Sequence, residues 1–290
     1  MAKPEKAKKQ YFYIINVKLR NKHTKADLEP LAYEKLFRRL WRSKIHKESS
    51  PQKHCIIKAC REEKEEGEFF FFSGLLAQFT FIEGESWFNA DSLEVVDDFQ
   101  IPDNYFPDLV LTEYIFVPAA HRFAFYTNSQ IAISPYPVKN FLEMALDAVT
   151  ESNEIVEVDV ETSNDGIQQI LNAMVIKKIK MDVNYSNFDI GTDVKKFFED
   201  SLRDSNTANM TIIATAKEDN SIEIDKSPIL QGALATVQSN GDAEARIIDE
   251  HGRLKTVKTH DYPRKEDIFG VPTRFPQLAY EKIMNIFRNK

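Results

Sequence analysis

The alternation of apolar and polar positions predicts strands over much of the first half of the chain. β-branched and aromatic residues, which favour strands, dominate 11–20, 54–60, 67–82 and 113–128. The last segment would hold two strands joined near residues 119–121. The four phenylalanines at 69–72 are too continuous for a strand with one solvated face. We therefore expect the strand over 67–82 to lie in the centre of a sheet.

Helical spacing of apolar residues predicts a helix over 27–44, with Thr24 or Asp27 as its cap and Pro30 tolerated in its first turn. A loop followed by a second helix is predicted over 134–151. The second half alternates between strands and helices, and two hairpins precede its last helix. The expected elements are strands at 154–162 and 175–185, helices capped by Ser163 or Asn164 and by Thr192, hairpins over 210–225 and 245–259, and a helix over 275–290.

This order of elements predicts an α+β fold with two mixed domains, largely antiparallel sheets and flanking helices. A length of 290 residues suits one large or two ordinary domains, and 42% apolar with 29% charged residues is a globular composition. The predicted divisions are a basic tail over 1–10, an N-terminal domain over 11–150 and a C-terminal domain over 151–290.

Composition and motifs exclude several classes of protein. Two cysteines cannot cross-link a secreted scaffold, and no apolar run approaches the roughly 20 residues of a membrane span, so a cytoplasmic protein is expected. The sequence holds no phosphate-binding glycine loop, no GxSxG and no HExxH. His54, Cys55 and Cys60 lack metal-ligand spacing, and buried thiols are favoured there. We predict no cofactor and no metal, and a binding protein in preference to an enzyme.

The net charge of −7 is unevenly distributed. Residues 1–61 hold 17 Lys and Arg against 5 Asp and Glu, whereas residues 62–150 hold 3 against 16. On the predicted helix over 27–44, Lys35, Arg38, Arg39 and Arg42 lie opposite the apolar arc. Clustered cations favour phosphate binding. The candidate nucleic-acid-binding residues are Arg20, Lys22, Lys25, Lys35, Arg38, Arg39, Arg42 and Lys44. Alternatively, these cations pair with the acidic middle of the same chain.

Two other functions stay open from the residues alone. A metal-dependent nuclease needs converging carboxylates. Glu157, Asp159 and Glu161 share one face of a predicted strand, and Glu223, Asp225 and Lys226 lie close together. The acidic segment 62–150 could instead be a protein-interaction module that mimics nucleic acid toward a basic partner.

The order of elements resembles that of the RexA-like family of phage-exclusion proteins. The resemblance rests on YFYIINVKLRNK (11–22), the aromatic strand at 69–72, the 113–146 region, and the later succession IKMDVNY, DVKKFFEDSL, MTIIATAKEDNSIEID and EHGRLKTV. It implies a two-domain α+β homodimer that binds DNA without marked sequence preference and acts in abortive infection or another phage defence. A second protein of the defence system is a further expected partner.

The expected function is therefore sequence-nonspecific DNA binding in bacterial anti-phage defence. The alternatives are the nuclease and the acidic interaction module.

Overall fold

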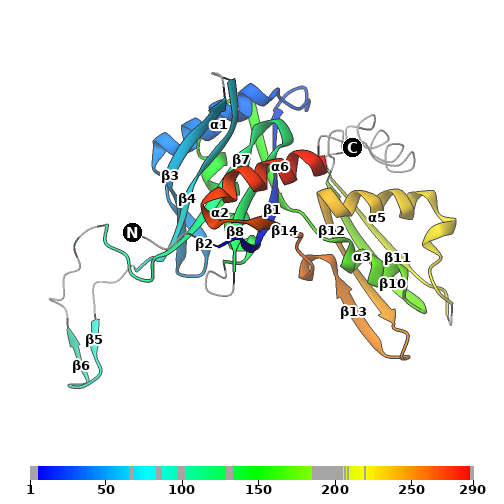
Figure 1. The fold of residues 1–290 in the computed structure, drawn as a ribbon. Helices are drawn as coiled ribbons and strands as arrows, with labels where there is room; N and C mark the ends of the chain where they lie inside the picture. The colour runs from blue at the N-terminus through cyan, green and yellow to red at the C-terminus, as the bar shows by residue number, and fades with distance from the viewer. Residues whose placement is uncertain are drawn as a thin grey trace.

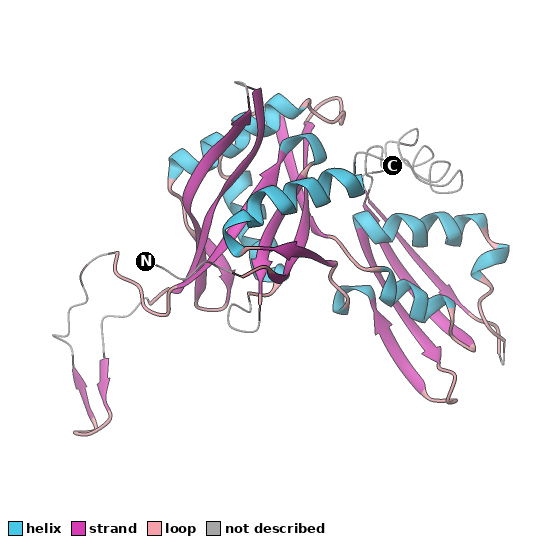
Figure 2. Cartoon of the chain, in the orientation of Figure 1, coloured by secondary structure: helices cyan, strands magenta, loops and turns pink. Residues whose placement is uncertain are grey.

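The computed structural model describes residues 6–65, 68–82, 87–96, 102, 104–128, 133–184, 205, 207, 209–218 and 220–287. It has the predicted α+β fold (Figures 1 and 2). The helices are α1 (Pro30–Ser43), α2 (Pro135–Asp147), α3 (Asn164–Leu171), α5 (Pro228–Asn240) and α6 (Phe275–Phe287). The strands are β1 (Lys8–Asn21), β2 (Lys47–Ser50), β3 (Lys53–Glu65), β4 (Glu68–Thr80), β5 (Trp87–Asn89), β6 (Glu94–Val96), β7 (Val110–Val117), β8 (Arg122–Thr127), β9 (Glu154–Val160), β10 (Val175–Asn184), β11 (Asn209–Thr215), β12 (Gly241–Ile248), β13 (Leu254–Lys258) and β14 (Lys265–Gly270).

The larger sheet is antiparallel and is organised around β1. Its strand order is β14-β1-β8-β7-β4-β3-β2, and β9 also pairs with β1. β8 follows one edge of β1, while the other edge is shared: β14 pairs with its first half and β9 with its second half. β4 lies between β7 and β3, which places the phenylalanine-rich strand inside the sheet, as predicted.

The two faces of this sheet hold separate apolar cores. Alternate residues of β1 point to opposite faces. Val17 and Leu19 pack on one side with α1 and α2, and Phe12 and Ile14 pack on the other side with α6. α1 buries Tyr33, Leu36, Phe37 and Leu40, which confirms the predicted apolar arc.

A smaller sheet, in the order β11-β10-β12-β13, lies beside the first (Figure 1). Its buried residues form a third core with residues of α3 and α5, including Ile167, Ile170, Leu234 and Val237. The Ser163 hydroxyl caps α3 by accepting from the Asp165 amide, so Ser163 is the cap among the two residues predicted, Ser163 and Asn164.

The strand pairing crosses the domain boundary predicted at residue 150, because β9, β14 and α6 all join the first sheet or its cores. Two expectations about single elements are wrong. Residues 221–225 do not pair back on β11, since Ile224–Lys226 form a 3-10 turn and β11 pairs with β10. Glu29, and neither Thr24 nor Asp27, precedes the first turn of α1.

The predicted basic tail over 1–10 is shorter than expected, because Lys8 to Gln10 already belong to β1, and residues 1–5 lie outside the described residues. The helix expected after Thr192 also lies outside them.

A close approach between β3 and β4 generates a stability prediction. A Cβ placed on Gly74 would lie 1.9 Å from the backbone oxygen of Ala59, whereas one on Gly270 would meet the flexible end of the Leu278 side chain at 2.4 Å. Gly74→Ala must displace backbone, so we expect it to lower the free energy of unfolding by about 2 kcal/mol or more. Urea denaturation measures this, with Gly270→Ala as the milder control. Equal free energies of unfolding for the two variants would contradict the close approach between β3 and β4 at Gly74.

Candidate nucleic-acid interface

The outer face of α1 carries the predicted cations, but two of its arginines are paired with acids. Arg38 Nε lies 2.7 Å from Glu62 and its guanidinium 3.2 Å from Glu34. Arg39 pairs with Glu151 at 2.8 Å and with Glu154. Both guanidinium charges are therefore locally compensated. For Arg38 the partner Glu62 comes from the acidic middle of the chain, which is the alternative that the sequence left open.

The remaining predicted cations divide into one buried and five exposed side chains. The Arg20 side chain is only 4% exposed and pairs with Asp27 at 3.3 Å and Glu157 at 3.1 Å, so it cannot form part of an exposed surface. The exposed cations occupy the turn after β1 and the length of α1: Lys22, Lys25, Lys35, Arg42 and Lys44. The structure thus brings only part of the predicted set to the surface.

Three of the carboxylates considered for a nuclease form ion pairs with cations of the same chain. Glu157 pairs with Arg20, and Glu161 lies 2.8 Å from Arg122, with both of these side chains almost fully buried. Arg122 also donates to Asn16 at 2.7 Å. Glu223 instead forms an exposed pair with Lys226. Within the described residues, no group of three or more His, Cys, Asp or Glu could hold a metal ion.

The side chains of Cys55 and His121 both pack against other parts of the folded chain. Cys55 is a buried free thiol, and burial raises its pKa to about 11. The ring of His121 stacks on Tyr33 with centroids 4.3 Å apart.

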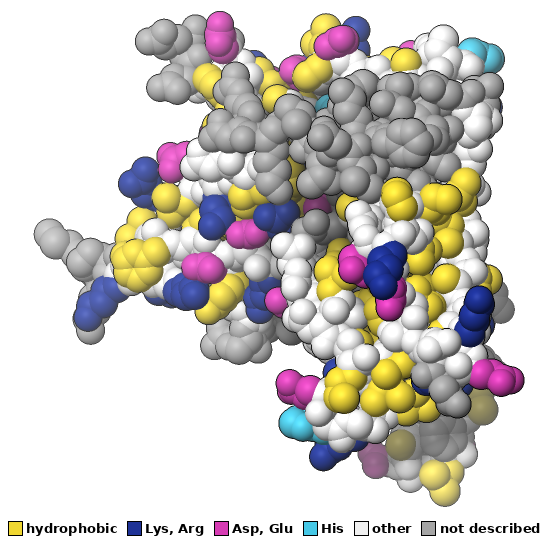
Figure 3. All heavy atoms as spheres, turned by 90° about the vertical axis from the view of Figure 1, so that its right-hand side faces the viewer, with side chains coloured by type: hydrophobic (Ala, Val, Ile, Leu, Met, Phe, Trp, Pro, Cys, Tyr) yellow, Lys and Arg dark blue, Asp and Glu magenta, His cyan; other side chains and the backbone are white. Residues whose placement is uncertain are grey.

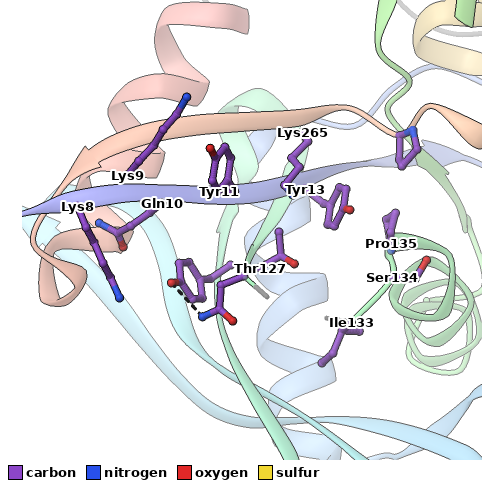
Figure 4. A pocket seen from close by; sticks show the side chains of 13 residues that line it. Lys8, Lys9, Gln10, Tyr11, Tyr13, Thr127, Ile133, Ser134, Pro135 and Lys265 are labelled. Carbon is purple, nitrogen blue, oxygen red and sulfur yellow. Dashed lines mark hydrogen bonds between the residues drawn. The ribbon is translucent and has the colours of Figure 1, made fainter. Parts of the chain in front are cut away.

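A different group of cations surrounds a cavity of about 850 Å³ at the start of β1 (Figure 4). We call it the lysine–tyrosine pocket. Residues of β1, β8 and β14 and of the start of α2 line it. Its lining residues are Lys8, Lys9, Gln10, Tyr11, Tyr13, Tyr126, Thr127, Asn128, Ile133, Ser134, Pro135, Pro263 and Lys265.

Strand register explains why these cations and rings meet. Tyr13 lies opposite Lys265 in the β1–β14 ladder, and directly opposed side chains share a face. The Lys265 ammonium is 4.8 Å from the Tyr11 ring centroid and 5.7 Å from that of Tyr13. The Lys9 ammonium is 5.3 Å from the Tyr11 ring. Lys9, Lys265, Tyr11 and Tyr13 therefore form a compact unit. In this unit each ammonium group lies over at least one tyrosine ring.

One acid lies beside this unit. Asp267 is 3.4 Å from the Lys9 ammonium, and its hydrogen bond and charge raise the pKa of Lys9 above the usual value. Lys9 is therefore cationic at neutral pH, although Asp267 partly offsets it. The positive end of the α2 dipole, at Ser134 and Pro135, adds to the attraction for an anion.

The pocket and α1 lie at opposite ends of β1. The Tyr33 hydroxyl of α1 accepts from the Leu19 amide at 2.9 Å, and Leu19 is about 20 Å along the strand from Tyr13 at the usual rise per residue. Sequence reasoning missed the pocket because Lys265 is remote in sequence and the strand β14 was not predicted. The available signal was the alternation of Lys9, Tyr11 and Tyr13, which places their side chains on one face.

The buried charges on β1 generate a pH prediction. Lys18 is 5% exposed, and burial is the main cause that lowers its pKa from 10.5 to about 8. Between these values the unfolded chain binds the proton that the folded chain has released, so the free energy of unfolding rises with pH. We expect wild type to gain about 2–3 kcal/mol relative to Lys18→Met between pH 8 and 10.5. Urea titrations across this range measure it, and parallel pH profiles would contradict it.

Comparison with known proteins gives a family and no described activity. No helix within the described residues is long and apolar enough to cross a membrane. No curated protein matches the chain. One family, described as "Domain of unknown function (DUF4747)", matches residues 8–285 and so includes the lysine–tyrosine pocket, both sheets and most of α6. Since this match extends over most of the sequence, the chain belongs to the DUF4747 family.

Proposed function

We propose that this protein binds nucleic acid without marked sequence preference, and that the lysine–tyrosine pocket is its binding surface. The observation that carries the proposal is that Lys8, Lys9 and Lys265 line one cavity together with Tyr11 and Tyr13. A volume of about 850 Å³ lies within the range of ligand sites.

The chemistry of the pocket suits a polyanion that also carries flat rings. Lysine ammonium groups attract phosphates as point charges and release counterions on binding. Tyrosine rings stack on any base, because every base has a π-face. Neither kind of contact distinguishes one base from another, which supports binding that is largely independent of sequence.

The charges on one side of the molecule and the net charge of the chain support a localised site. On the side of the molecule shown in Figure 3, cations and acids are interspersed, and the described residues there do not form a broad positive patch. A chain with net charge −7 repels a polyanion at long range. Binding would therefore depend on short-range contacts at one place where lysines and rings coincide.

The setting of this binding belongs to the same proposal. The resemblance to RexA-like proteins implies DNA as the ligand and phage exclusion as the role. We expect expression of the protein in a susceptible bacterium to lower the number of plaques, and expect a variant with a disabled pocket to restore it. Equal plaque counts with and without the protein would contradict the defence role, while leaving the binding proposal to its own test.

Charge reversal tests the binding surface. Lys8→Glu with Lys265→Glu places two acids at the pocket, and we expect affinity for a labelled oligonucleotide to fall at least about tenfold at low salt, with a smaller salt slope. Fluorescence anisotropy over a series of salt concentrations measures both quantities.

The matched control is Lys35→Glu with Arg42→Glu, which makes the same change in net charge on the exposed face of α1. We expect it to weaken binding much less. A larger loss in this control would place the surface on α1, and wild-type protein that binds no oligonucleotide at low salt would overturn the proposed function.

A further inference from the structure

We propose that the pocket prefers single-stranded nucleic acid, whose unpaired bases stack on an aromatic platform formed by Tyr11 and Phe269. This inference rests on the proposed function and names the form of nucleic acid that the same site takes. The feature that leads to it is the exposed ring of Phe269 on β14.

Phe269 is a large ring on a strand, yet it is 72% exposed. It lies opposite Lys9 in the β1–β14 ladder, so its side chain is on the face that carries Tyr11, Tyr13 and Lys265. Exposed aromatic rings that cluster beside a pocket mark contact surfaces more often than isolated ones do. The neighbouring residue Ile268 points to the opposite face and is buried, which fixes the direction of Phe269.

Rings and cations therefore alternate over this part of the sheet. Along β1 the face presents Lys9, Tyr11 and Tyr13, and along β14 it presents Phe269, Asp267 and Lys265 in the opposite direction. Each ring has an ammonium group beside it, on its own strand or on the neighbouring one. Figure 4 shows Lys9, Tyr11 and Lys265 on one side of the β1 ribbon. Sheets that bind single strands use this combination of stacking rings with backbone-tracking cations.

A duplex could use only half of this surface. Its bases are stacked on one another and expose only their edges in the grooves, so their faces are not available to Tyr11 or Phe269. A duplex would contact the lysines through its phosphates and gain nothing from the rings. A single strand can satisfy the lysines with phosphates and cover the rings with bases, so it should bind more tightly.

The experiment compares two probes and two variants. The probes are a labelled oligo-dT of about 12 nucleotides with a central 2-aminopurine, and a blunt duplex of the same length. We expect Phe269→Ala to weaken single-strand binding about tenfold, the cost typical of one lost base–ring stack, and to change duplex binding by less than about twofold. The quenching of 2-aminopurine fluorescence on binding should fall in parallel.

Tyr105→Ala is the matched control, because Tyr105 is also an aromatic residue and is 71% exposed but lies in the loop before β7. It should leave binding of both probes unchanged. Equal wild-type affinity for single strand and duplex, or an equal loss for both in Phe269→Ala, would overturn the single-strand preference and leave nucleic-acid binding in place. Binding of neither probe by wild type would overturn both proposals together.

Discussion

Backbone hydrogen bonding along both edges of β1 is the constraint on which the rest of the structure depends. Buried N–H and C=O groups must be paired, and β1 runs for 14 residues with strands of the larger sheet on both of its sides. β8 pairs with the middle of one edge, and two strands share the other edge. β14, from near the end of the chain, pairs with its first half, and β9, from the middle, with its second half. This pairing brings the C-terminal segment onto the N-terminal strand, and so places Lys265 beside Tyr13.

The surroundings of β1 differ between its first and its second half, on both faces of the sheet. At its start, Tyr11 and Tyr13 line the pocket while Phe12 and Ile14 are in the core under α6. Towards its end, Val17 and Leu19 enter the other core, while Lys18 and Arg20 form a buried charged cluster with acids of β9. Buried charges are costly unless paired, and a shift of one residue would turn the acids to the wrong face. The charged cluster therefore stabilises the β1–β9 register.

Local pattern was sufficient to predict most elements, and long-range pairing accounts for what it could not predict. The strands around residues 54–82 and 113–128, the amphipathic α1 and the Ser163 cap follow from periodicity and local hydrogen bonding. β14 was missed because KEDIFG begins with three consecutive charged residues, which do not form a strand pattern, and it becomes a strand by pairing with β1. The same reason hid the pocket. No pattern within residues 8–13 indicates that Lys265 lies over the Tyr11 ring, about 250 residues away in sequence.

The contrast between α1 and the pocket shows why the charge of a segment does not locate a binding surface. Arg38 and Arg39 contribute to the excess of cations in residues 1–61, but folding places Glu62, Glu151 and Glu154 against them. An ion pair cancels the field that a phosphate would feel. Lys265 is held over tyrosine rings, and a cation–π contact orients an ammonium group without removing its charge. A lysine fixed in this way keeps its attraction for a phosphate and lies next to a ring on which a base can stack. The type of partner that each cation acquires on folding therefore decides where a polyanion can bind, and on this chain the rings that hold the lysines would also hold the ligand.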